Sequence, residues 1–309
     1  MGCENKSGLS KPEPKDRDSL SKLEPEPLYQ EQWAINYDKE FYDTHEINQN
    51  SHINSAQVNL TGKGIKIAVI DSELDTNHPE FKKNIINTVN SADGSNDVSC
   101  KYLYDSYYEL RDCGHGSAVT GIIASNINGS GLWGIAPNVQ IIFIQLDLDS
   151  DHGDAVILNA FDFAEKFDAD IVSNSWGTED VSPVVADKIN NMATNGRDGK
   201  GILVVFASGN DNIEVPDDES MLESVIGVGA SDEENLRAEY SNYGDGLDIV
   251  APGGDILGIT TTGYREEGIG DFIKAEDYEL SFSGTSASAP IVSAALALLL
   301  EKNPQLTRQ

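Results

Sequence analysis

The chain has 309 residues, enough for one large α/β domain or two small ones with a sizeable core. It carries 52 acidic side chains against 21 basic ones, which gives a net charge of −31 at pH 7. Such a surface repels nucleic acids and anionic membranes and suits cations and basic peptides; the bland alternative is that the excess only keeps the protein soluble. No stretch approaches the roughly 20 apolar residues of a membrane helix, and no secretory leader is recognisable.

The first 27 residues differ in composition from the rest of the chain. They are polar and rich in proline, and such a segment cannot bury a core. We therefore expect a disordered tether over 1–27 and a globular domain over 28–309. Cys3, in MGCENKSG, resembles the start of a mature bacterial lipoprotein and implies a lipid anchor as the only link to a membrane. Myristoylation is disfavoured, because Lys6 stands where Ser or Thr is required.

The other two cysteines, Cys100 and Cys113, flank a tyrosine-rich loop. Their spacing permits a short-loop disulfide in an oxidising compartment, and the alternative is two unrelated thiols. The sequence leaves this choice open.

Apolar runs alternate with amphipathic stretches through most of the chain. Buried strands are predicted at 65–70, 140–146, 169–175 and 201–207. Helices are predicted between them, at 117–124, 154–167 and 184–194. This alternation indicates an α/β fold with right-handed crossovers, in which a mainly parallel central sheet is flanked by helices on both faces. Functional side chains are then expected at the carboxyl ends of the strands.

Three segments place reactive side chains at such positions. Asp71 ends a strand in IAVIDSELDTNHPEF, His115 opens a helix in RDCGHGSAVTGIIAS, and Ser286 opens the last helix in SFSGTSASAPIVSAALALLL. A serine hydroxyl is a weak nucleophile that needs a base, and a histidine of near-neutral pKa can serve as that base. A buried carboxylate orients the imidazole and stabilises its protonated form. Asp, His and Ser are therefore predicted to form a nucleophilic triad.

A fourth segment, VVFASGNDN, places Asn210 after a strand and a Ser-Gly turn. Its side-chain amide can donate to an oxyanion, as can the backbone N–H of Ser286 at the start of a helix. We predict that these two donors share that role.

These segments resemble the subtilisin-like serine proteases, over about residues 28–309. Four motifs carry the resemblance in the family's order: DSELDTNHPEF, GHGSAVTGIIAS, ASGN and SGTSASAP. The resemblance implies the roles given above to the triad and to Asn210. It also implies a tight turn at Gly284 and Thr285, with Pro290 in the first turn of the last helix, where its missing N–H costs least.

Within the family, the likeness is closest to the kexin-like processing enzymes, on the segments PLYQEQWAI, SNSWGTED and LLLEKNPQLT. This implies a preference for basic residues before the cut, with the acidic loop 146–154 at the rim of the cleft. Several positions depart from the pattern, among them Ser117 and Ala118, which stand where the family has Thr and Arg. Glu73 replaces a glycine, and Ser72 replaces the second Asp of the kexin-like enzymes, which argues against strict dibasic specificity.

The resemblance also implies a substrate-binding wall along which an extended peptide adds as a strand. Its expected residues follow two predicted strands: Ser173, Ser175, Trp176, Gly177, Ala207, Ser208 and Gly209.

A structural calcium site is implied on a tight loop with hard oxygen ligands, the alternative being an ordinary Asn-Gly turn. Glu80 and Asn128 would bind through their side chains. Asn126, Ser130 and Leu132 would bind through their carbonyls. A second site is implied near Asp180, but its later glutamate is replaced by Asn242.

The expected protein is a secreted or envelope-anchored serine endopeptidase that acts as a monomer on peptide or protein substrates through an acyl-enzyme. An alternative is an inactive subtilisin-like scaffold that binds peptides. Because the family usually continues beyond the serine helix, we also expect the domain to be truncated at its C-terminus.

Overall fold

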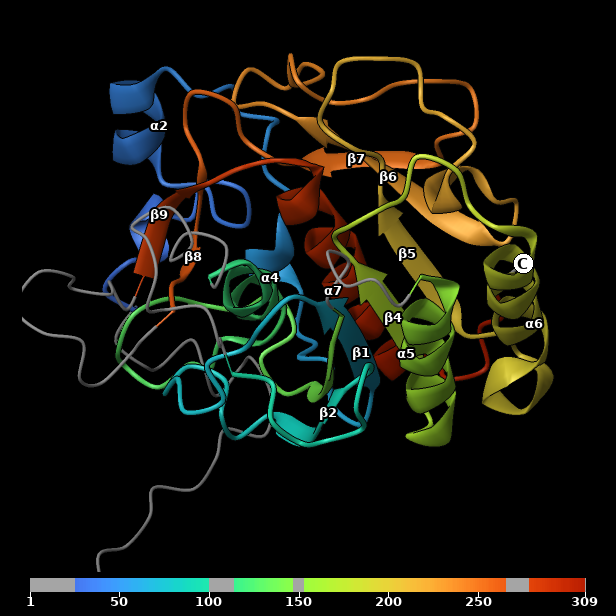
Figure 1. The fold of residues 1–309 in the computed structure, drawn as a ribbon. Coiled ribbons are helices and arrows are strands. Elements are labelled where there is room, and N and C mark those ends of the chain that lie inside the picture. Colours follow the sequence, from blue (N-terminus) through green and yellow to red (C-terminus); the bar gives the residue numbers. More distant parts are fainter. Residues whose placement is uncertain (1–25, 100–113, 147–152, 265–277, 309) are drawn as a thin grey trace, which may run out of the picture.

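The computed structural model describes residues 26–99, 114–146, 153–264 and 278–308. Its centre is a seven-stranded sheet with the order β2-β3-β1-β4-β5-β6-β7, in which all neighbouring strands are parallel (Figure 1). The strands are β1 (Lys66–Asp71), β2 (Ile85–Asn90), β3 (Gln140–Gln145), β4 (Ile171–Asn174), β5 (Leu203–Ala207), β6 (Val225–Ser231) and β7 (Ile249–Pro252). A separate antiparallel hairpin joins β8 (Ile259–Thr262) to β9 (Tyr278–Phe282).

Helices cover both faces of the sheet. On one face lie α4 (His115–Ala124) and α7 (Thr285–Lys302), and on the other lie α5 (Asp154–Lys166) and α6 (Pro183–Gly199) (Figure 1). The shorter helices are α2 (Lys39–His45), η1 (Tyr29–Glu31), η2 (Ser55–Gln57) and η3 (Glu219–Met221). None of the described helices is long and apolar enough to cross a membrane.

The central strand β1 shows why the sheet must be covered on both sides. Ile67 and Val69 point into the core shared with α4 and α7, whereas Ala68 and Ile70 point into the core shared with α5 and α6. Alternate side chains of a strand face opposite ways, so an uninterrupted apolar run needs two apolar layers. The strand therefore carries Asp71 out of the core at its carboxyl end.

Helix α4 lies very close to the sheet because its second residue is a glycine. A Cβ on Gly116 would lie 2.3 Å from the carbonyl oxygen of Glu73 and 2.8 Å from the Phe143 ring. Both distances are shorter than any tolerable contact. The glycine thus allows the start of α4, with His115, to approach the end of β1.

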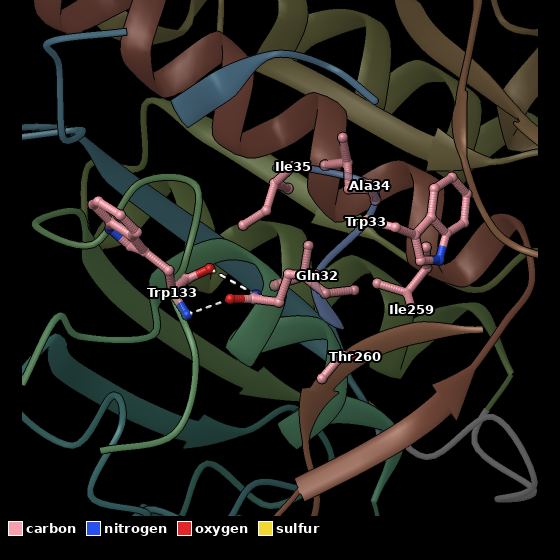
Figure 2. Close-up of a pocket in the computed structure, with 9 residues that line it drawn as sticks. Gln32, Trp33, Ala34, Ile35, Trp133, Ile259 and Thr260 are labelled. Atoms are coloured by element: carbon pink, nitrogen blue, oxygen red, sulfur yellow. Dashed lines mark hydrogen bonds between the residues drawn. The ribbon is translucent and has the colours of Figure 1, made fainter. Parts of the chain in front are cut away.

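The chain before β1 is part of the domain. The indole Nε1 of Trp33 donates to the carbonyl of Gly258 at 2.8 Å, and the Gln32 amide pairs with the main chain of Trp133 (Figure 2). These residues line a cavity of about 10 Å³, which holds at most one water. This cavity is a packing feature and offers no room for a ligand.

The predicted fold class is confirmed, with element ends shifted by a few residues. Sequence reasoning missed five strands: β2, β6 and β7 of the central sheet and both strands of the hairpin, β8 and β9. The strand β2 is half-exposed and polar, and β6 contains two glycines in VIGVGAS, so neither gives a clear apolar signal. The predicted tether was wrong at Glu26, which is buried against the loop that contains Gly129. Residues 1–25 of the predicted tether lie outside the described residues.

Replacing Gly116 by Ala should destabilise the fold by about 1–3 kcal/mol through overpacking against the Glu73 backbone. Alanine is the better helix former, by about 1 kcal/mol, so a loss can only come from these contacts. Urea unfolding in a Ser286→Ala background measures it. The control is Gly229→Ala on β6, where the nearest atoms lie at 3.3 and 3.4 Å and a smaller loss is expected. Equal stabilities for the two variants would contradict this account of α4.

Candidate active site

Asp71 and His115 are joined by a short hydrogen bond. The imidazole Nδ1 lies 2.6 Å from Oδ1 of Asp71, whose residue is only 4% exposed. The same oxygen accepts the backbone N–H of Ser72 at 2.8 Å. The His115 ring also meets Phe282 of β9 edge-on, with 5.5 Å between ring centroids. The carboxylate and the phenyl ring together fix the plane of the imidazole.

Ser286 is the second residue of α7 and is tied to the end of β4. Its carbonyl accepts the Ser175 hydroxyl at 3.0 Å, and its own hydroxyl lies 3.3 Å from the Ser175 carbonyl. The prediction for Pro290 was wrong, because the helix begins at Thr285 and the proline lies in its second turn. Its missing N–H would have bonded the Ser286 carbonyl, and the Ser175 hydroxyl takes that place.

Helix packing brings Ser286 to the same end of the sheet as the Asp71–His115 pair. Helices α4 and α7 pack against each other and share one apolar core with β1, and β1 and β4 are neighbouring strands. In Figure 1, α7 begins near the ends toward which the arrows of β4 and β5 point. Residues separated by more than 200 positions in the chain therefore lie at the same end of the sheet.

Asn210 is exposed, and its amide has a defined orientation. Oδ1 accepts from the backbone N–H of Thr285 at 2.9 Å and from the Thr285 hydroxyl at 3.0 Å. Because the oxygen is occupied on the α7 side, Nδ2 remains as the donor. The amide thus lies beside the turn that carries Ser286.

The predicted substrate wall offers backbone rather than side chains. Ser173 and Ser208 are fully buried, and the Ser173 hydroxyl bonds Ser293 of α7 at 2.9 Å. The Trp176 indole turns inward, donates to the carbonyl of Ile70 at 3.1 Å and packs on Phe206. The structure therefore does not present the side chains of Ser173, Ser208 and Trp176 to a substrate.

The other wall residues, Ser175, Gly177, Ala207 and Gly209, lie at or just beyond the carboxyl ends of β4 and β5. Gly177 is exposed and Gly209 is partly exposed. Gly177 therefore offers exposed backbone to an extended peptide, whereas the N–H and the carbonyl of Gly209 are already bonded to the Thr285 hydroxyl and to the N–H of Asn242.

Two buried carboxylates next to this wall were missed by sequence reasoning. Asp218 and Glu219 are 6% and 1% exposed, and one oxygen of each lies 3.8 Å from where a Cβ on Gly177 would be. Both Glu219 oxygens accept hydrogen bonds from Thr178. Burial raises the pKa of Asp218, and the neighbouring Glu219 raises it further. Their pairing with Gly177 depends on tertiary contact, so only the acidic run PDDES hinted at them.

The predicted calcium loop faces two buried carboxylates, one of them unforeseen. Glu80 is fully buried and accepts the Tyr278 hydroxyl at 2.8 Å and the Asn128 amide at 3.2 Å. Glu26 is 2% exposed and accepts the Gly129 N–H at 2.7 Å, while its Oε2 is buried without a hydrogen-bond partner. Burial raises the pKa of Glu80 to about 8, and the charge of Glu26 adds to the shift.

The oxygen donors of this loop are of the kind that a hard cation prefers. A buried, unpartnered carboxylate oxygen beside a second carboxylate is a site where a cation would offset the cost of burial. Asn128 would ligate through Oδ1 only after its amide turned over, because Nδ2 faces Glu80. Asn126 uses its own amide on the Glu80 carbonyl and on Asn84. The main chain of Ser130 and Leu132 remains for the carbonyl ligands of the prediction.

The second predicted calcium site does not fit. Asp180 is exposed, and Oδ1 of Asn242 already accepts hydrogen bonds from the N–H groups of Asp211 and Ile213. Within the described ranges, no group of three or more His, Cys, Asp or Glu side chains could hold a metal ion. Cys3, Cys100, Cys113 and most of the loop 146–154 lie outside those ranges, so the predictions made for them stay predictions.

The fold and the site together define a class: a parallel α/β protein that presents Asp, His and Ser, in this chain order, at the carboxyl edge of its sheet. The chain belongs to the subtilase family, whose family model matches residues 62–309.

Two relatives come from Bacillus subtilis (strain 168). The chain is 34% identical over 250 residues to the minor extracellular protease Epr, covering 80% of this chain and 34% of that protein. It is 32% identical over 251 residues to the major intracellular serine protease, covering 78% and 69%. The chain thus spans only about a third of the length of Epr.

Solved structures agree on the fold. The serine protease of Aeromonas sobria, in complex with its chaperone ORF2, superposes with a TM-score of 0.76 at 22% identity, covering 91% of this chain and 55% of that one. A cold-adapted subtilisin-like serine proteinase gives a TM-score of 0.63 at 24% identity, covering 82% and 81%.

In the metal-free protein, the free energy of unfolding should fall as the pH rises from about 4.5 to about 8. The folded state holds a proton on Glu80 up to about pH 8, whereas the unfolded chain releases it near 4.5. The contribution of Glu80 to the free energy of unfolding is therefore complete below about pH 4.5 and lost above about pH 8. Urea unfolding of Ser286→Ala protein in EDTA measures the slope, and Glu80→Gln is expected to flatten it. Millimolar calcium should also flatten it, and a slope equal in all three samples would contradict this reading.

Proposed function

We propose that the chain is a serine endopeptidase in which Asp71, His115 and Ser286 form the catalytic triad. The observation that carries the proposal is the 2.6 Å bond between a buried carboxylate and His115, at the sheet edge to which α7 brings Ser286. A histidine held in this way can accept a proton through Nε2 without losing its orientation. Membership of the subtilase family supports the same reaction.

In the proposed mechanism, the Ser286 hydroxyl attacks the scissile carbonyl carbon as its proton passes to Nε2 of His115. Asp71 stabilises the imidazolium that results. His115 then gives the proton to the leaving amine, which releases the first product and leaves an acyl-enzyme. A water, deprotonated by His115, hydrolyses the ester and restores the serine. The long contact of the Ser286 hydroxyl with the Ser175 carbonyl, 3.3 Å, is weak enough to be exchanged during attack.

The tetrahedral intermediate would be stabilised by two donors, the backbone N–H of Ser286 and Nδ2 of Asn210. The support for Asn210 is the fixed position of its oxygen on Thr285, which leaves the nitrogen as the free end of the amide.

We further propose a preference for a basic residue before the cut. Asp218 and Glu219 put two buried carboxylates within reach of Gly177, at the wall. Both Glu219 oxygens already accept a hydrogen bond from Thr178, and Oδ2 of Asp218 lies near Gly177. An arginine or lysine side chain of the substrate would offset the cost of burying these charges. The relatives reported above are bacterial subtilases, so the likeness to the kexin-like branch remains a prediction.

A calcium ion would be held by Glu80 and Asn128, with main-chain carbonyls of Asn126, Ser130 and Leu132, and Glu26 would add a second carboxylate. Bound there, the ion would stabilise the loop and the N-terminal segment rather than take part in the reaction.

We also propose that the protein is exported, as a monomer that acts on peptides or proteins. One relative named above is extracellular and another is intracellular, so their names do not decide where this protein is located. A lipid anchor at Cys3 is part of this proposal.

A fluorophosphonate should modify Ser286 and no other serine, because only an activated hydroxyl reacts at neutral pH. Mass spectrometry of the labelled peptide detects the adduct. His115→Ala should abolish labelling and lower kcat by about 10⁶-fold, the magnitude found for the catalytic histidine of a subtilisin, a member of this family. A folded wild-type protein that never labels would instead favour the peptide-binding scaffold.

Asp218→Asn should lower kcat/KM for substrates with Arg or Lys before the cut by about 10–100-fold, the worth of one charge-assisted hydrogen bond. Substrates with an apolar residue there should change much less. A peptide-library cleavage profile of wild type and variant measures both. Asp217→Asn, an exposed neighbour, serves as the matched control. A wild-type profile that favours apolar residues would reject the basic preference but not the triad.

A further inference from the structure

The loop from Ser208 to Ile213 carries Asn210 and part of the wall, and one buried side chain spans its whole length. The Asn242 amide nitrogen donates to the Ser208 carbonyl at 2.9 Å, and its backbone N–H donates to the Gly209 carbonyl at 3.0 Å. Its Oδ1 accepts the N–H of Asp211 at 2.9 Å and that of Ile213 at 3.3 Å. Asn242 is 3% exposed.

The backbone of this loop is shaped to admit that amide. Gly209 has φ +93, and a Cβ there would lie 2.5 Å from the Asn242 nitrogen. Asn212 also has a positive φ, of 55. Successive N–H and C=O groups can turn toward one side chain only in such a tight bend. The neighbouring Arg237 adds a bond to the Asn212 side chain, so the loop has further support at its far end.

Only an amide satisfies all the groups that face this position. The Ser208 carbonyl needs a donor, while the N–H groups of Asp211 and Ile213 need an acceptor. A carboxylate supplies acceptors alone and would require a cation to bridge it to the carbonyl. A serine is too short to span the loop.

We propose that Asn242 is a positioning residue for catalysis: it fixes the backbone on both sides of Asn210 and so sets the place of the oxyanion donor. Thr285 holds the Asn210 oxygen from α7, and Asn242 holds the main chain before and after Asn210. The inference rests on the proposed function, because it assigns Asn242 a part in the same reaction.

A double-mutant cycle tests it, with kcat and KM measured on a peptide that the wild type cleaves. Asn210→Ala should lower kcat by about 10²–10³-fold, a magnitude known from a subtilisin of this family. Asn242→Ala should lower kcat by about 10-fold or more and change KM less, as expected for a misplaced catalytic group. In the Asn210→Ala background, the same change should cost less than about 3-fold, because the donor it positions is gone.

Asn242→Asp covers the case in which the alanine variant does not fold. It keeps the size and the Oδ1 acceptor, but places an oxygen against the Ser208 carbonyl, so a similar loss of kcat is expected. The matched control is Asn84→Ala, which removes another buried amide, bonded to the carbonyls of Pro137 and Val139. Its effect should be additive with that of Asn210→Ala.

The outcomes separate the two proposals. Additive losses for Asn242 and Asn210, or an Asn242→Asp variant with wild-type kcat, would overturn the positioning role while leaving the triad intact. A folded wild type that neither turns over nor labels at Ser286 would overturn the proposed function, and this inference with it. Non-additive losses, confined to the Asn242 variants, support it.

Discussion

The hydrogen bond between Asp71 and His115 is the interaction around which the site is arranged. It depends on where β1 ends. The apolar run of β1 is buried on both faces, and Asp71 follows it directly at the carboxyl end of the strand. Helix α4 has to come within contact distance of that end, and the missing side chain at Gly116 makes this possible. A carboxylate that is 4% exposed then has a nearby ring nitrogen as its partner.

The second half of the site depends on small residues at the start of α7. Ala287 and Ala289 are fully buried between the helix and the sheet, and Ser293 bonds Ser173 inside β4. Small side chains let the helix axis come close to the strands, so Ser286 lies directly over the end of β4. Pro290 leaves a carbonyl unpaired within the helix, and the Ser175 hydroxyl uses it as a tie to the sheet.

Pairs of buried carboxyl groups are the protein's other recurring feature. Glu26 and Glu80 share one buried environment, and Asp218 and Glu219 share another. A carboxylate pair is costly to bury, so each place is one where a cation has a large effect on stability or binding. Under the proposals above, the first pair meets calcium and the second meets a basic substrate side chain.

The sequence by itself determined the parallel sheet, the three triad candidates and the amide at Asn210. Apolar periodicity and short motifs are local signals, so they can be recognised in the sequence alone. The sequence did not place β2, β6 or β7 of the central sheet, or the β8–β9 hairpin, because short, polar or glycine-rich strands depend on their neighbours for their hydrogen bonds. Nor could it show that Trp176 turns inward. The pairing of Glu26 with Gly129, of Asp218 with Gly177 and of Asn242 with the loop 208–213 was decided by tertiary structure alone. Each pairing joins segments that the chain separates by tens of residues and that only packing brings together.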